Sequence, residues 1–151
     1  MQALTTPTAA ELNKFYPVSE SIPDKKREEL SNYVQNHTFV KMFGYEAATK
    51  ISSGEIPDSS SPGFLGFQKF LALCCAYQQI TDPLVSTNFG AKIIDRPGAV
   101  NPTNNQKSIT LIAIENTMSI HYREAYKIVS GSKCGGVPTW GGYFSYKMSR
   151  L

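Results

Sequence analysis

The chain has 151 residues, of which 41% are hydrophobic and 18% are charged, and its formal net charge is +3 at pH 7. These values exclude an acidic disordered chain, a collagen-like repeat and a disulfide-based scaffold, and they predict one domain with a single hydrophobic core. The net charge is too small to indicate a nucleic-acid-binding protein on its own.

Residues 6–15 predict a short helix. Either Thr6 or Thr8 can cap its N-terminus, and Glu11 follows Thr8 at the spacing of a capping box. In such a box the threonine hydroxyl accepts a hydrogen bond from the backbone N–H of the glutamate. The glutamate carboxylate in turn accepts one from the backbone N–H of the threonine.

Residues 23–43 predict a longer helix, because their apolar side chains recur near the helical period. Gly44 is expected to stop or kink this helix, and residues 45–51 can add two further turns. The next stretch, residues 52–63, is polar and rich in serine, glycine and proline, which predicts turns.

Residues 64–80 predict the central buried helix, because apolar side chains lie nearly all round it. Pro62 suits the first helical position, and Pro83 ends the helix because the residue before a proline is disfavoured in the α conformation. Cys74 and Cys75 are adjacent within this apolar run. We therefore expect them to be buried, unbridged thiols of a protein from a reducing compartment.

An extended element is expected over residues 86–95, where β-branched residues flank an Asn-Phe-Gly turn signal. Residues 103–130 then predict the longest helix, with Gly131 in the left-handed position after its end. The predicted fold class is therefore mainly α, a four-helix-type bundle with a short β element and an extended C-terminal tail.

The predicted core consists of apolar side chains that the helical period places on the inner faces of the helices. On the longest helix this period assigns Ile109 and Ile112 to one apolar face with Met118 and Tyr122. The expected core residues are Val34, Val40, Phe67, Phe70, Leu71, Cys74, Tyr77, Ile112 and Met118.

The composition changes at residue 132, which divides the chain into a helical domain, residues 1–131, and a C-terminal arm, residues 132–151. The arm has four glycines and four aromatic residues, and after Glu124 the chain has basic but no acidic side chains. Aromatic anchors favour docking on a neighbouring protein. Interleaved basic and aromatic residues leave nucleic acid as an alternative, and packing within the chain is the third.

No residue pattern indicates catalysis, a cofactor or a metal. The chain lacks the glycine-rich, serine-nucleophile and zinc-binding motifs of common enzymes. Neither His37 nor His121 has a second histidine or cysteine one helical turn away, and a buried Cys74 would be an inert thiol. No stretch resembles a membrane span or a secretory signal. We therefore expect no catalytic, cofactor-binding or metal-binding residues and no membrane association.

The order of the segments resembles that of a known protein family. The second helix ends in residues 40–45, VKMFGY, and the buried helix leads into residues 86–92, STNFGAK, before the long last helix. This layout resembles the small head–tail connector proteins, or neck adaptors, of tailed bacteriophages, and most of all the branch from phages of Bacteroidetes hosts. In that family a helix ending in Leu-Gly-aromatic precedes a buried helix and a (T/S)xxG extended element.

The resemblance implies a structural virion protein without catalytic activity. It implies a ring of about twelve copies seated between portal and tail or neck proteins, with DNA only passing through the lumen. The competing interpretation is a small helical nucleic-acid-binding regulator or an uncharacterised enzyme. The expected subunit and partner contacts are Phe89 and Lys92 in the extended element, and Trp140, Tyr143, Phe144, Tyr146, Lys147 and Arg150 in the arm.

Overall fold

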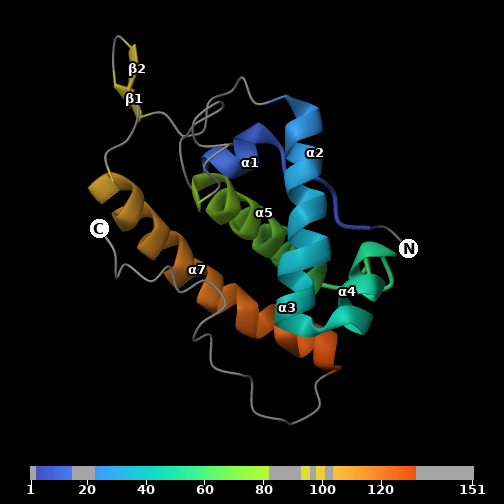
Figure 1. Ribbon diagram of the computed structural model, residues 1–151. Helices are drawn as coiled ribbons and strands as arrows, with labels where there is room; N and C mark the ends of the chain where they lie inside the picture. Colours follow the sequence, from blue (N-terminus) through green and yellow to red (C-terminus); the bar gives the residue numbers. More distant parts are fainter. Residues whose placement is uncertain (1–2, 15–22, 82–92, 96–97, 101–103, 132–151) are drawn as a thin grey trace.

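The computed structural model describes residues 3–14, 23–81, 93–95, 98–100 and 104–131, and this part of the chain is mainly helical (Figure 1). Its centre is α5 (Gly63–Thr81), which contacts α1, α2, η1 and α7. Ten of the helix's side chains from Phe70 onward are buried, as the apolar composition predicts. The helix ends at Thr81, before the predicted stop at Pro83.

The N-terminal segment is fixed to α5 by hydrogen bonds. The backbone N–H of Thr5 donates to Oε1 of Gln68 at 3.0 Å, and Nε2 of Gln68 donates to the carbonyl of Thr5 at 2.6 Å. The helix α1 (Ala9–Asn13) follows, shorter than predicted. Thr8 is its cap, and both hydrogen bonds of the capping box with Glu11 are present, which confirms that part of the prediction.

The helix predicted over residues 23–43 is continuous in the structure, but it contains three segments of different helical type. These are α2 (Asp24–Tyr33), a π-helical turn η1 (Val34–Thr38) and α3 (Phe39–Phe43). A π turn inserts an extra residue into the helix and so rotates the side chains of the next helical segment about the axis. Val34, at the start of the π turn, and Phe39, directly after it, are both completely buried.

Gly44 ends α3 and begins α4 (Tyr45–Ser52), as the sequence predicts. Its φ of 90° and ψ of 162° lie in a region that is essentially restricted to glycine. The chain therefore changes direction at Gly44, and α4 buries Ala48 and Ile51 beside α3 and η1.

The long helix α7 (Asn104–Ser130) packs along α5. Gly63 lies close to α7: a Cβ there would lie 2.5 Å from Cδ1 of Ile128, so the end of that side chain would have to move. The hydroxyl of Tyr77 donates to Oε1 of Glu115 at 3.0 Å and links the C-terminal part of α5 to the middle of α7. Gly131 follows α7 with a φ of 64°, which confirms its predicted left-handed conformation.

One core prediction is wrong. Ile112 is 48% exposed and Ile109 is 61% exposed, whereas the buried face of α7 consists of Leu111, Ile114, Met118, Tyr122 and Ala125. The other expected core residues are buried, except that Val40 is only partly buried against the core. The aromatic part of this core is continuous, since Phe39, Phe43, Phe67, Phe70 and Tyr122 have ring centroids 5.6–6.3 Å apart.

Two short strands precede α7. β1 (Ile93–Asp95) pairs antiparallel with β2 (Gly98–Val100), with Ile94 opposite Ala99 in the register. The expected extended element at residues 86–95 overlaps β1, and its residues 86–92 lie outside the described part of the chain.

Candidate functional site

The contact residues expected from the sequence lie outside the described part of the chain. Phe89 and Lys92 belong to residues 82–92, and Trp140, Tyr143, Phe144, Tyr146, Lys147 and Arg150 belong to residues 132–151. The candidate sites are therefore built from two other features, an exposed apolar face and a pocket.

The first feature is a second apolar face on α7. We call it the α7 stripe and define it as Ile109, Ile112, Ala113, Asn116 and Ile120, all of which are exposed; four are apolar, and Asn116 is polar but uncharged. The isoleucines alone are 61%, 48% and 63% exposed. At 3.6 residues per turn these five positions share one side of the helix, opposite the buried face.

The α7 stripe is also free of charge. Between Ser108 and Ile120 the only charged side chain is Glu115, which accepts the hydrogen bond from Tyr77 at 3.0 Å. An ordinary helix at the surface of a domain has charged and polar residues opposite its buried face. A contiguous exposed apolar face indicates a surface that contacts another molecule.

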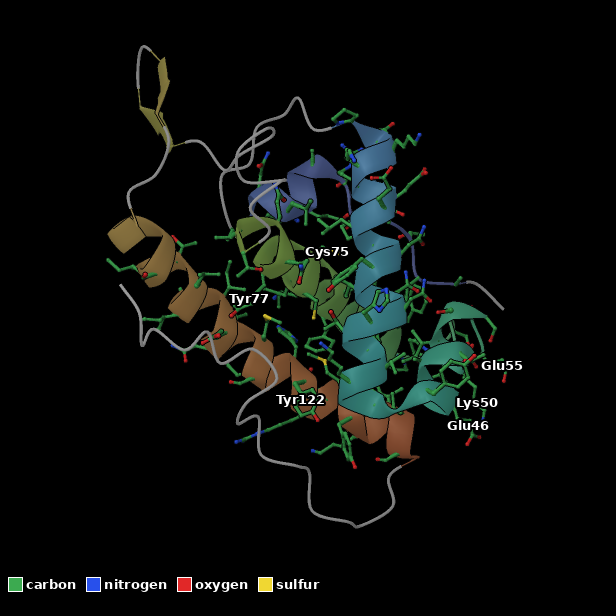
Figure 2. The ribbon with its side chains drawn as sticks, in the orientation of Figure 1. Glu46, Lys50, Glu55, Cys75, Tyr77 and Tyr122 are labelled. Atoms are coloured by element: carbon green, nitrogen blue, oxygen red, sulfur yellow. The ribbon has the colours of Figure 1, made fainter. Side chains whose placement is uncertain are left out.

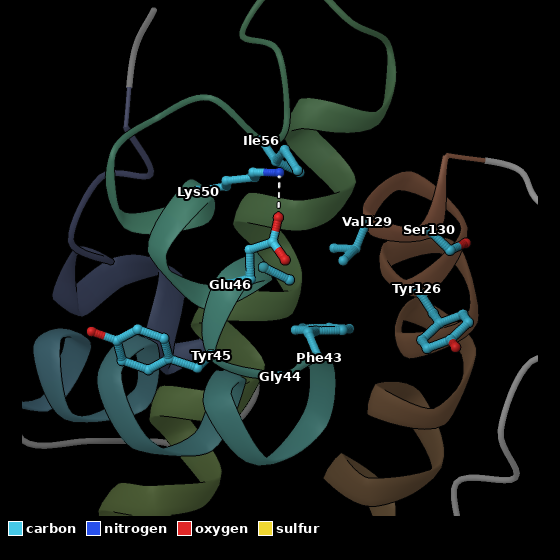
Figure 3. Close-up of a pocket in the computed structure, with 10 residues that line it drawn as sticks. Phe43, Gly44, Tyr45, Glu46, Lys50, Ile56, Tyr126, Val129 and Ser130 are labelled. Atoms are coloured by element: carbon cyan, nitrogen blue, oxygen red, sulfur yellow. Dashed lines mark hydrogen bonds and ion pairs between the residues drawn. The ribbon is translucent and has the colours of Figure 1, made fainter.

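The second feature is a pocket of about 490 Å³ between α3, α4 and the C-terminal end of α7 (Figure 3). We call it the α4 pocket. Phe43 and Val129 extend toward each other from α3 and α7, with Tyr126 beside Val129 and Ile56 at one side. Within the described part of the chain, the lining residues are Phe43, Gly44, Tyr45, Glu46, Ala47, Lys50, Ile56, Tyr126, Val129 and Ser130.

The α4 pocket has a charged rim. Nζ of Lys50 donates to Oε1 of Glu46 at 3.0 Å. The hydrogen bond and the attraction of Lys50 lower the pKa of Glu46, and the same interaction raises the pKa of Lys50. Glu46, Lys50 and Glu55 lie together at the outer edge of the molecule (Figure 2). The pocket lining thus combines apolar side chains, such as Phe43 and Val129, with one exposed ion pair.

The two histidines, His37 and His121, lie on different helices, and neither belongs to the α7 stripe or the α4 pocket. His37 is exposed and packs on the ring of Tyr33, with ring centroids 4.7 Å apart. His121 is partly buried, and its Nδ1 lies 3.7 Å from Oε2 of Glu124, an acidic neighbour on the same helix. In the described ranges, no three His, Cys, Asp or Glu side chains gather in a way that could hold a metal ion.

Cys74 and Cys75 are free thiols and are buried, as the sequence predicts. Burial raises the pKa of both thiols, and the neighbouring Cys75 raises that of Cys74 further. The thiolate is the nucleophilic form, so these thiols are unreactive in the folded chain.

Comparison of the chain with protein-family models, curated proteins and solved structures finds no match. No helix in the described part of the chain is long and apolar enough to span a lipid bilayer.

Sequence reasoning missed both candidate features. It placed Ile109 and Ile112 on one apolar face with Met118 and Tyr122, and it listed Ile112 in the core. At 3.6 residues per turn these two isoleucines lie mainly on the other side of the helix from Met118 and Tyr122, so the sequence contained the signal of a second apolar face. The α4 pocket joins residues that are distant in sequence, such as Phe43 and Val129, so no local pattern could have revealed it.

Proposed function

We propose that this protein is a structural protein of a tailed-phage virion, which assembles into a ring of identical copies in the neck between portal and tail. The proposed subunit is a four-helix-type bundle with a short β element and a C-terminal arm. Its role is to join its neighbours around a lumen through which DNA passes. This role requires assembly surfaces and no catalytic residue.

The observation that carries the proposal is the α7 stripe. Fully burying an exposed isoleucine side chain contributes roughly 1.5–3 kcal/mol, and Ile109, Ile112 and Ile120 are each about half exposed, so each can contribute about half of that on association. A ring is built from one repeated head-to-tail contact, in which the stripe of one copy packs on a different surface of the next. The order of the segments, which resembles that of neck adaptors, supports the specific setting.

The test is the association state of the full chain in sedimentation velocity over a range of concentrations. Ile112→Asp and Ile120→Asp place a carboxylate in the proposed contact, where it would lose its water on association. We expect the unmodified chain to form large oligomers and both variants to shift toward the monomer.

Leu65→Asp is the control, because Leu65 is also an exposed apolar residue, 77% exposed, and it lies on a different helix, α5. It should leave association unchanged, and circular dichroism should show the same helical content for all variants. An unmodified chain that stays monomeric, or stripe variants that associate as it does, would contradict the proposal.

A further inference from the structure

The α4 pocket lies where the described part of the chain ends. Ser130 is the last residue of α7 and lines the pocket, and Gly131 then turns the chain with a φ of 64°. The C-terminal arm, residues 132–151, therefore follows directly after a residue that lines this pocket of about 490 Å³.

We propose that Trp140, the only tryptophan of the chain, occupies the α4 pocket of its own molecule and anchors the arm there. The proposal concerns a single molecule and does not depend on the ring.

The chemistry of the pocket matches an indole side chain. Phe43, Ile56 and Val129 supply apolar surface for the ring faces. An indole also has one N–H donor, which needs an acceptor when buried, and the rim carboxylate of Glu46 can accept it beside Lys50. The ammonium group of Lys50 can in addition lie over the electron-rich ring face, a cation–π contact.

The length of the arm favours the pocket of the same molecule. The spacer 132–139 reaches at most roughly 30 Å when fully extended. A globular chain of this length has a radius of gyration of about 15 Å, so equivalent pockets on adjacent copies lie roughly a molecular diameter of ~40 Å apart. The tether also gives the indole an effective concentration of about a millimolar or more at its own pocket.

Trp140 is the first aromatic residue of the arm, and Gly135 and Gly136 in the spacer permit the reversal that the return to the pocket requires. The expectation that the arm docks on a neighbour then applies to its distal aromatic residues, Tyr143, Phe144 and Tyr146. Anchoring at Trp140 would hold these residues near one end of α7.

The experiment uses the intrinsic fluorescence of the full chain, which reports on one tryptophan only. We expect an emission maximum at shorter wavelength than in denaturant and acrylamide quenching several-fold weaker. Both should be independent of protein concentration, down to dilutions at which sedimentation shows monomer. Emission and quenching equal to those of the denatured chain would overturn the proposal. A short-wavelength emission and weak quenching that are both lost on dilution would overturn it too, because the indole would then be bound to another copy of the chain.

Ala47→Glu locates the site, since it puts a charge into the pocket lining. It should shift the emission to longer wavelength and raise quenching toward the denatured value. Thr49→Glu is the matched control, because Thr49 is exposed on the same helix and is not part of the lining; it should change neither value. Equal effects of the two variants, or no effect of Ala47→Glu in a chain that keeps its helical content, would refute binding at this pocket.

Discussion

At the scale of single residues, the stability of the fold rests on aromatic side chains between α3, α5 and α7. Phe70 is fully buried, stacks on Phe39 with ring centroids 5.9 Å apart, and lies 6.3 Å from the ring of Tyr122. Aromatic pairs contribute beyond their buried area, so this cluster joins the three helices more firmly than aliphatic contacts of the same size would.

Phe70→Ala should lower the free energy of unfolding by roughly 3–5 kcal/mol, because it leaves a cavity at the centre of this cluster. Chemical denaturation measures the change. Leu65→Ala on the same helix is the control and should cost well under about 1 kcal/mol, since Leu65 is 77% exposed. A loss under about 1 kcal/mol for Phe70→Ala would mean that α5 is not the centre of the core.

The buried thiols give a second prediction at this scale. In a Cys134→Ser background, Cys74 and Cys75 should resist alkylation at mildly alkaline pH, because burial raises the pKa of both thiols and excludes the reagent. Mass spectrometry should find modification only as fast as the chain unfolds, and destabilisation by Phe70→Ala should accelerate it. Rapid alkylation of the folded chain would show that the thiols of Cys74 and Cys75 are accessible to the reagent, against this prediction.

At the scale of elements, the junction of α3 and α4 depends on one backbone conformation. Gly44→Ala should cost about 1–3 kcal/mol, because its φ of 90° is unfavourable for a residue with a Cβ. Among the described residues other than Gly44 and its two chain neighbours, no atom lies within 4 Å of the position of the added Cβ, so the expected cost comes from the backbone conformation.

Gly66→Ala is the matching control, because Gly66 lies inside α5 and its added Cβ would make only an ordinary contact, 3.8 Å from Oε2 of Glu124. There the same change should stabilise the fold by up to about 1 kcal/mol. Thermal or chemical denaturation that shows the same sign for both variants would contradict the assignment of Gly44.

Much of the helical structure could be predicted because its signals are local. The Thr8 capping box, the break at Gly44 and the end of α7 at Gly131 each depend on residues within one turn of the site. The continuous apolar run of α5 identified the central helix for the same reason.

The prediction of the buried face of α7 was wrong because it grouped Ile109 and Ile112 with Met118 and Tyr122, although at 3.6 residues per turn the two isoleucines lie mainly on the other side of the helix. The helix has two apolar faces, and packing on α5 decides which of them is buried. The π turn η1 and the α4 pocket have the same origin, since both arise from how separate segments meet. Local propensity contains no information on such contacts.

At the scale of the whole molecule, we propose that the α7 stripe is the surface through which copies assemble and that the α4 pocket holds the arm of its own chain. The α7 stripe presents apolar side chains without charge on the side of α7 opposite α5, and the α4 pocket opens where the arm begins. In the proposed ring, the stripe joins neighbouring copies and the anchored arm extends its distal residues toward the next component.

This division of roles predicts that a chain ending at residue 131 still forms rings, because the stripe is retained. It should fail to attach to portal or tail proteins, which co-sedimentation with purified partners would show. A truncated chain that no longer forms rings but keeps its helical content would instead place the arm in the contact between copies.

The central claim, assembly of identical copies through the α7 stripe, is tested most directly by electron microscopy of the purified full chain beside its Ile112→Asp variant. We predict closed rings of one uniform copy number for the unmodified chain and isolated subunits for the variant. Isolated subunits in both samples, or rings that persist in a folded Ile112→Asp variant, would contradict the claim.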